Sequence, residues 1–197
     1  MTRRLFVICF LVISSAFGSE IREFDLKTLQ QLGNELTRVS QTRDRGATDP
    51  ARKKAIQTAK AALQGKLFNI HYDYVVLNDP KGSGFLVYAL GSTGNAGDVV
   101  LAGHFRVTVS ADGSKTERVD ALSKSLAIQH GGQSLPPGSH LAGLHMVQIV
   151  SPKPVETLVY TNRITNLPIV VATLPNGRIF EIENGKIEDT GQTVGKK

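Results

Sequence analysis

Two segments near the N-terminus repeat their apolar residues at steps of three and four, the spacing of one face of an α-helix. The first apolar stripe consists of Leu26, Leu29, Leu32, Leu36 and Val39. The second apolar stripe consists of Ile56, Ala59 and Leu63. Each stripe predicts an amphipathic helix with one buried face.

Start and stop signals bound the second helix. Asp49 is a good N-cap, Pro50 suits the first helical position, and Gly65 suits the position after the last turn. Because the link over residues 43–48 is short, the two helices are expected to form an antiparallel hairpin over residues 19–66.

From residue 67 onward, apolar and polar residues alternate, and turn-forming residues separate the alternating runs. The runs predicted as strands are 68–76, FLVYAL, 99–110, SKTERV, LSKSLAIQ, HLAGLHMVQIVS, ETLVYTNR, PIVVAT and RIFEIE. Asp112-Gly113 is a hairpin signal, and Asn184-Gly185 predicts a last turn before a short polar tail. The expected fold class is α+β, with a helical hairpin followed by a mainly antiparallel, curved β-sheet over 67–197, packed together as one domain.

Residues 1–18 have the layout of a secretory signal peptide. Arg3 and Arg4 precede an apolar run over residues 5–13, and small residues Ala16 and Gly18 precede Ser19. A membrane anchor is the alternative, but this run is too short to span a hydrocarbon core of about 30 Å. We therefore expect an exported bacterial protein, secreted or periplasmic, without a transmembrane segment after cleavage.

The composition of the chain narrows the chemistry. Its single cysteine, Cys9, would leave with the signal peptide, which excludes a cysteine nucleophile, a cysteine-ligated metal and any disulfide. A hydrophobic content of 41% with a net charge of only +6 excludes a disordered chain.

Positive charge is concentrated in the predicted hairpin. Residues 19–66 hold 10 basic and 6 acidic side chains, whereas residues 67–197 hold 11 of each. The candidate residues for binding an anionic partner are Arg52, Lys53, Lys54 and Lys60, with Arg38, Arg43 and Arg45 nearby. An anionic envelope component or a protein partner would fit this helix face, and a solvated face is the alternative. Aromatic residues do not interleave with the charges, so nucleic-acid binding is not expected.

The run over residues 99–110 carries the first candidate site. Alternation places Val107 on a core face and both His104 and Arg106 on the opposite face. Two residues apart on a strand, these side chains would lie about 7 Å from each other and could polarise an anionic or carbonyl group. The alternative is an ordinary wet face of an antiparallel sheet.

His71 and Asp73 form the second candidate pair, opposite the aromatic face of the predicted strand over 68–76. A histidine oriented by a carboxylate has the arrangement of a general base. Side chains at positions i and i+2 point outward in parallel, so a solvated polar face is again the alternative.

Three further histidines, His130, His140 and His145, lie close in sequence but do not predict a metal site. His140 and His145 are five residues apart, which places them on opposite faces of a strand. His145 shares its face with Val147 and Ile149, which indicates a buried structural histidine. No cofactor is predicted, since the sequence has no phosphate-binding glycine loop between a strand and a helix.

The stretches GHFRVTVSADG, the following LSKS, and HMVQIVSPKPVETLVYTNRITNLPIVVAT resemble a recurrent group of exported bacterial proteins of unknown function. The similarity covers roughly the C-terminal half. It implies export and a bacterial source, and it implies no catalytic residue.

Two classes of function remain open. The first is a non-enzymatic binding or interaction protein of the cell envelope, which follows from the signal peptide, the basic helices and the lack of a catalytic motif in the sequence. The second is a hydrolase-like enzyme with a His/Arg site on the polar face of the sheet. This enzyme would need the two candidate pairs to converge with the loop over residues 130–139.

Overall fold

A computed structural model describes residues 21–95, 97–130 and 141–195. The signal peptide predicted over 1–18, His140 and most of the 130–139 loop lie outside these described residues. The helices are α1 (Leu26–Ser40), α2 (Pro50–Leu63) and α3 (Glu156–Thr165). The strands are β1 (His71–Asn78), β2 (Phe85–Ser92), β3 (Val99–Ala102), β4 (Phe105–Val109), β5 (Thr116–Ala121), β6 (Ala127–Gln129), β7 (Leu144–Gln148), β8 (Ile169–Thr173), β9 (Arg178–Glu183) and β10 (Lys186–Thr193).

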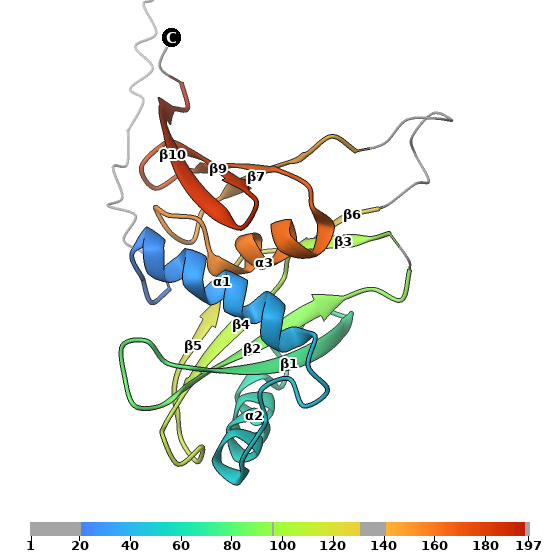
Figure 1. The fold of residues 1–197 in the computed structure, drawn as a ribbon, viewed down its shortest axis with the longest axis vertical. Helices are drawn as coiled ribbons and strands as arrows, with labels where there is room; N and C mark the ends of the chain where they lie inside the picture. Colours follow the sequence, from blue (N-terminus) through green and yellow to red (C-terminus); the bar gives the residue numbers. More distant parts are fainter. Residues whose placement is uncertain (1–20, 96, 131–140, 196–197) are drawn as a thin grey trace, which may run out of the picture.

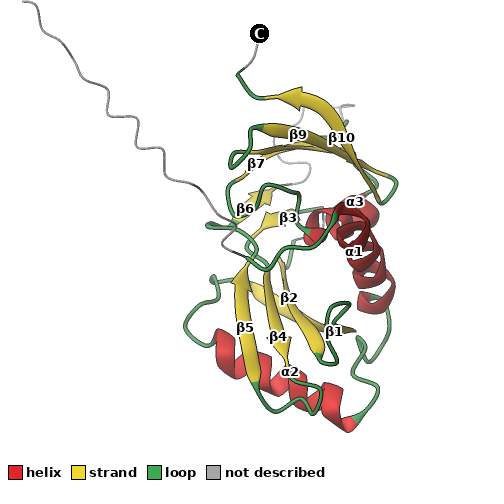
Figure 2. Ribbon diagram, turned by 90° about the vertical axis from the view of Figure 1, so that its left-hand side faces the viewer, coloured by secondary structure: helices red, strands yellow, loops and turns green. Residues whose placement is uncertain are grey.

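The strands of the described residues form three sheets (Figure 1). The first sheet has the order β1-β2-β4-β5 and is antiparallel throughout. The second has the order β10-β9-β8-β7, with β7 and β8 parallel, and β3 pairs with β6 separately. Figure 2 shows α2 on the outer side of the first sheet and α1 with α3 between the first and second sheets. The predicted α+β class with mainly antiparallel pairing is confirmed.

α1 and α2 lie on opposite faces of the first sheet, as Figure 2 shows. The residues of β2 explain this arrangement, because Leu86 and Tyr88 face the core that holds α1, whereas Val87 and Ala89 face the core that holds α2. A sheet that is apolar on both faces has to be covered on both faces. The two helices therefore do not pack on each other as the predicted hairpin, and each belongs to a separate core.

α2 begins where the sequence predicts, and an aspartate caps both N-terminal helices. The Asp25 carboxylate accepts a hydrogen bond from the Thr28 N–H at 2.9 Å, and Asp49 caps α2 in the same way. α1 approaches α3 closely at Gly33, where a Cβ atom would lie 2.4 Å from the Cβ of Val159. The glycine therefore permits the contact that fixes these two helices between the sheets.

The predicted strand ETLVYTNR is the helix α3, so this prediction is wrong. Its β-branched and aromatic residues, such as Val159 and Tyr160, favour strands, but tertiary packing overrides this preference. α3 connects the parallel strands β7 and β8. Its buried residues occupy most of its circumference, so the helix lacks the clear apolar stripe that identifies α1.

The predicted strand over 99–110 is two strands in different sheets. The chain passes from β3 to β4 at Gly103 and His104. β4 keeps the predicted alternation of Arg106 and Val107, but both of its faces are buried. Two other predictions also differ: LSKSLAIQ contributes only the short β6, and the tail after Asn184-Gly185 is β10, paired with β9.

Candidate functional site

His104 lies inside the protein, with 2% of its surface exposed. Its Nδ1 accepts a hydrogen bond from the Gly91 N–H at 3.0 Å, and its Nε2 lies 3.2 Å from the Val100 carbonyl oxygen. These contacts assign the proton to Nε2, and burial lowers the pKa of His104 to about 4. The neutral ring therefore ties β2 to β3. His104 also lines a small depression of about 120 Å³ beside Tyr160 and Ile164, but both of its ring nitrogens are already occupied by backbone groups.

Arg106 is also buried, within a network of charged groups. Its guanidinium donates to Glu156 at 2.6 Å and to Asp120 at 2.8 Å, and the Tyr88 hydroxyl donates to the same Glu156 oxygen at 2.8 Å. Burial lowers the pKa of Arg106, but the negative charges of Glu156 and Asp120 raise it by more than burial lowers it. The guanidinium therefore stays charged. The pair His104 and Arg106 is therefore structural in this fold.

The segment before α1 closes this network on one side. The Arg22 N–H donates to Asp120 at 3.2 Å, and the Arg22 guanidinium makes two hydrogen bonds to Asp79, at 2.6 and 3.0 Å. Arg106 donates back to the Arg22 carbonyl and lies 4.9 Å from the ring centre of Phe24. A substrate therefore has no path to the Arg106 guanidinium from this side.

His71 and Asp73 lie together at the start of β1, where the His71 side chain is 69% exposed. His71 Nε2 is 3.3 Å from Asp73 Oδ1, and Arg45 Nη1 is 2.6 Å from the same oxygen. His71 and Asp73 are thus in contact, but the Asp73 carboxylate is also paired with the Arg45 guanidinium. The pocket around them has no serine, threonine or cysteine among its described lining residues, so it offers no nucleophile for a general base to activate.

A tight turn between α1 and α2 brings Arg45 to this site. Arg45 and Gly46 have left-handed backbones with φ of 48° and 84°, and a Cβ on Gly46 would lie 2.3 Å from the Val76 carbonyl oxygen. The Asp44 carboxylate accepts hydrogen bonds from the Gly46 N–H at 3.1 Å and the Thr42 hydroxyl at 3.0 Å. These bonds lower the pKa of Asp44, so its carboxylate is ionised and held within the turn.

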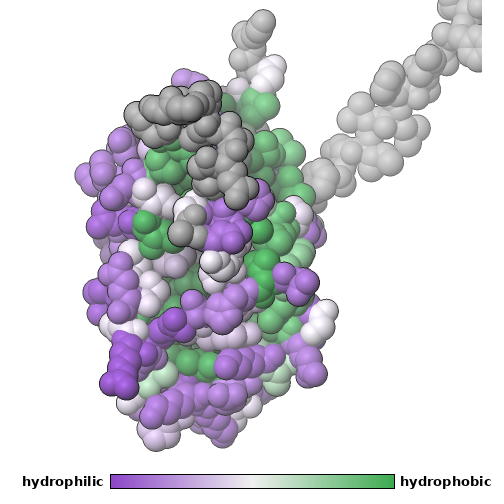
Figure 3. All heavy atoms as spheres, turned by 90° about the vertical axis from the view of Figure 1, so that its right-hand side faces the viewer, coloured by the Kyte–Doolittle hydropathy of each residue, from purple (hydrophilic) through white to green (hydrophobic). Residues whose placement is uncertain are grey.

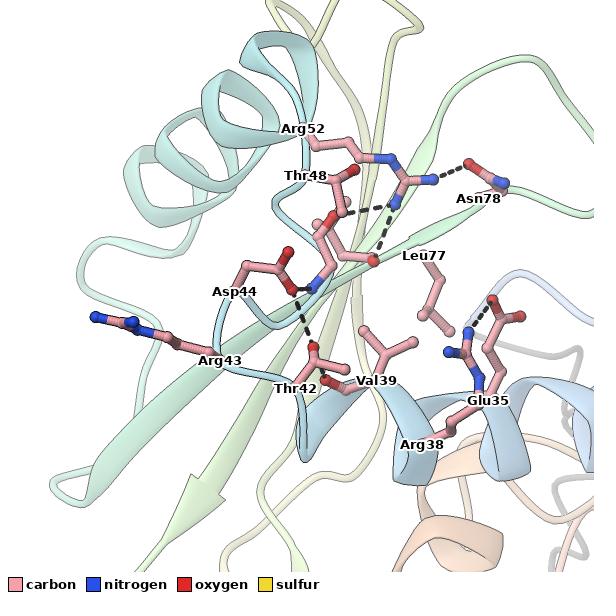
Figure 4. Close-up of a pocket in the computed structure, with 12 residues that line it drawn as sticks. Glu35, Arg38, Val39, Thr42, Arg43, Asp44, Thr48, Arg52, Leu77 and Asn78 are labelled. Carbon is pink, nitrogen blue, oxygen red and sulfur yellow. Dashed lines mark hydrogen bonds and ion pairs between the residues drawn. The ribbon is translucent and has the colours of Figure 1, made fainter.

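Two depressions open on either side of this turn. The first has a volume of about 800 Å³ and lies between α1, the N-terminus of α2 and the end of β1 (Figure 4). The second has a volume of about 560 Å³ and lies between the turn, α2 and the start of β1. Its charged and imidazole side chains are Arg43, Arg45, Lys60, His71, Asp44 and Asp73.

Arg52 supports the turn from the side of the first depression. Its guanidinium donates to the carbonyl groups of Gly46 and Val76, at 3.2 and 3.3 Å, and to the Asn78 side chain (Figure 4). In the same view Arg43 extends away from Arg52. Arg52 is therefore occupied by structural contacts, although the sequence suggested it as an anion-binding residue.

The three lysines of α2 do not all lie on one side of the helix. Hydrogen bonds from Ser110 and Ser114 lower the pKa of Asp112, in the turn between β4 and β5, and the nearby charge of Lys54 adds a smaller contribution in the same direction. Lys53 and Lys60 are exposed and seven residues apart, so two helical turns place them on one stripe. Lys60 lines the second depression, and its Nζ lies 5.0 Å from the ring centre of Tyr74.

We call the cations Arg43, Arg45, Lys53 and Lys60, together with the neighbouring His71, the cationic surface. Among the described residues, no carboxylate lies within ion-pair distance of Arg43, Lys53 or Lys60. The structure thus brings one predicted pair, His71 and Asp73, beside the predicted Lys60. The sequence indicates Arg43 and Arg45 only as neighbours of the α2 cations, and the local signal for their placement is the turn pair Asp44 and Gly46.

His145 is exposed on β7, so the expectation that it is a buried histidine is wrong. Leu144 and Gln148 face inward on this edge strand, while Val147 and Ile149 are 60% and 44% exposed. Within the described ranges, no group of three histidine, cysteine or acidic side chains is arranged to hold a metal ion.

Comparison of the chain with models of protein families, with curated proteins and with solved structures found no match. Across residues 21–95, 97–130 and 141–195, none of the helices combines the length and the apolar character needed to cross a membrane. What the cationic surface can bind is therefore argued from the positions and contacts of its own residues.

Proposed function

We propose that the protein is an exported binding protein that holds an anionic partner of the cell envelope on the cationic surface. The main support is a local imbalance between cations and anions. Arg43, Lys53 and Lys60 have no ion-pair partner among the described residues, whereas Asp44 and Asp73 already accept hydrogen bonds or ion pairs. Exposed cations without internal partners are the groups that an anionic partner can neutralise.

A hydrolase-like enzyme has less support. It would require His104 and Arg106 in an accessible pocket, and both are buried in contacts that hold the fold together. His71 and Asp73 remain accessible, but Arg45 occupies the carboxylate that would orient the histidine.

Export is proposed from the signal-peptide layout of residues 1–18. Ile21 is buried and Arg22 belongs to the network around Asp120, and both lie on the C-terminal side of the predicted cleavage position. Cleavage before Ser19 would leave these contacts intact. The mass of the protein recovered from outside the cytoplasm would test this proposal directly, because it should match a chain that starts at Ser19.

The binding proposal is tested by sedimentation with lipid vesicles. Wild type should bind vesicles that contain phosphatidylglycerol and should bind pure phosphatidylcholine vesicles much more weakly. The triple variant Arg43→Gln/Lys53→Gln/Lys60→Gln should lose most of this binding. The matched control Lys27→Gln/Lys115→Gln/Lys186→Gln removes three exposed cations elsewhere and should bind nearly as wild type does. Equal binding by both triple variants, or no preference for anionic vesicles, would show the proposal to be wrong.

A further inference from the structure

The second depression collects hydrogen-bond donors from three separate elements. Arg43 and Arg45 come from the turn, Lys60 comes from α2, and His71 comes from β1. Asp73 contacts two of these groups, since it lies 2.6 Å from Arg45 and 3.3 Å from His71. It therefore holds the two side chains in place before any ligand arrives, which lowers the entropy cost of binding.

The charges around the depression leave one positive charge uncompensated. Three cations, Arg43, Arg45 and Lys60, face two carboxylates, those of Asp44 and Asp73. Both carboxylates are already used within the protein, Asp44 by the turn and Asp73 by its neighbours. The depression therefore matches an anionic group with a single negative charge.

The walls of the depression are partly apolar. Ile56 and the rings of Tyr72 and Tyr74 contribute to the lining. The Tyr72 hydroxyl donates to the Gly103 carbonyl at 2.9 Å, so the ring of Tyr72 acts as a wall and its hydroxyl is not available to a ligand. The ring of Tyr74 lies 5.0 Å from Lys60 Nζ, so an apolar wall stands beside this exposed cation.

We propose that this depression binds the phosphodiester group of an anionic envelope component, a proposal that rests on the cationic surface being the binding site. A phosphodiester carries one negative charge, and its tetrahedral oxygens accept hydrogen bonds from several directions. A carboxylate also carries one charge, but its two oxygens lie in one plane and fit a single bidentate arginine best. Arg45 is already paired with Asp73, and the remaining donors come from different directions, which favours the tetrahedral group.

Nuclear magnetic resonance titration with two small anions of equal charge tests this preference. Dimethyl phosphate should produce saturable shifts at residues 43–45, 60 and 71, with an affinity several-fold higher than that of acetate at the same ionic strength. Lys60→Met should weaken the binding of dimethyl phosphate by about fivefold to tenfold. The matched control Lys54→Met, at an exposed position on another side of α2, should leave the affinity unchanged. Both substitutions are on the surface, and the spectra themselves report whether each variant is folded.

A second arm presents the same phosphodiester on phosphatidylglycerol vesicles and uses dimethyl phosphate as a competitor. Displacement of the protein from the vesicles indicates a lipid headgroup as the source. Saturable binding of dimethyl phosphate without displacement indicates a soluble phosphodiester, which also supports the proposal. Equal affinity for acetate and dimethyl phosphate, or no saturable shift with either, overturns it. If the phosphodiester proposal is overturned in this way, the proposed function still stands as long as vesicle binding depends on Arg43, Lys53 and Lys60. If vesicle binding does not depend on these residues, both proposals fail.

Discussion

Burial decides what the side chain of His104 can do. The sequence places this histidine on the polar side of an alternating strand, and such a pattern normally indicates a surface. In the folded protein the polar groups of His104 and Arg106 are satisfied by partners from distant segments, including Gly91 and Glu156. These partners could not be predicted from the sequence, because a polar face covered by another layer has the same local pattern as a polar face in water.

The neutral state of His104 makes the stability of the protein depend on pH. The pKa of His104 is 6.5 in an ordinary environment and about 4 in the folded protein, because burial disfavours the charged ring. Below about pH 6.5 the unfolded chain takes up a proton that the folded protein does not, so stability falls as the pH decreases toward 4. The full loss from this residue is about 3 kcal/mol, and its contribution is complete above about pH 6.5.

The variant His104→Gln removes this titration. The difference in free energy of unfolding between wild type and variant should therefore shrink by about 2 kcal/mol between about pH 7 and about pH 5. Urea unfolding at the two pH values measures this difference. A difference that stays constant with pH would show that His104 can take up a proton in the folded state.

Arg106 should be the most sensitive charged residue of the core. Arg106→Gln leaves Glu156 buried without its cation and removes one of the two arginines that pair with Asp120, and the expected loss of stability is about 3–5 kcal/mol. Lys115→Gln, which removes an exposed cation, should change stability by less than about 0.5 kcal/mol. Chemical unfolding of the two variants provides the measurement. A loss for Arg106→Gln as small as that of the control would mean that the network contributes little.

At the level of whole elements, local sequence signals identify a helix, whereas tertiary contacts decide what it packs against. The apolar stripes of α1 and α2 and the start signals of α2, Asp49 and Pro50, can be recognised in the sequence because they act locally. The packing partner of each helix was not readable, because it depends on which face of β2 each helix covers. The sequence pattern does not indicate α3 as a helix, because α3 is buried around most of its circumference and rich in residues that prefer strands.

The contact between α1 and α3 gives a test at this scale. Gly33→Ala adds a methyl group that would lie 2.4 Å from the Cβ of Val159. The helices would have to separate, and we expect a loss of about 1–3 kcal/mol, although alanine is the better helix former. Thermal or urea unfolding measures this loss. The exposed change Gln31→Ala, in the same helix, should be neutral or slightly stabilising, and a neutral Gly33→Ala would contradict the close contact.

The two N-terminal helices are also expected to be indispensable for folding. Leu36 and Leu63 are fully buried in two different cores, one on each face of the first sheet. A chain without residues 21–66 would expose both faces, so it should show no cooperative urea transition and no near-ultraviolet circular dichroism. A folded truncated protein would mean that the helices form a detachable module, as a hairpin would.

Across the whole molecule, charge is distributed unevenly. The cationic surface lies near α2, while Glu181, Glu183 and Glu188 gather on the exposed side of β9 and β10, which lie at the other end of the molecule from α2 (Figure 1). Hydrophilic side chains dominate the α2 end in Figure 3, while apolar side chains reach the surface further along the same face. The sequence predicted the basic character of residues 19–66, but the fold was needed to show which cations remain without partners.

The salt dependence of vesicle binding tests the central claim most directly. Affinity for phosphatidylglycerol vesicles would be measured over a range of ionic strength for wild type and for the charge-reversal variant Arg43→Glu/Lys60→Glu. We predict that wild-type binding weakens steeply as salt screens the charges, and that the variant shows no measurable binding even at low salt. Similar affinities and similar salt dependence for the two proteins would contradict a binding function of the cationic surface.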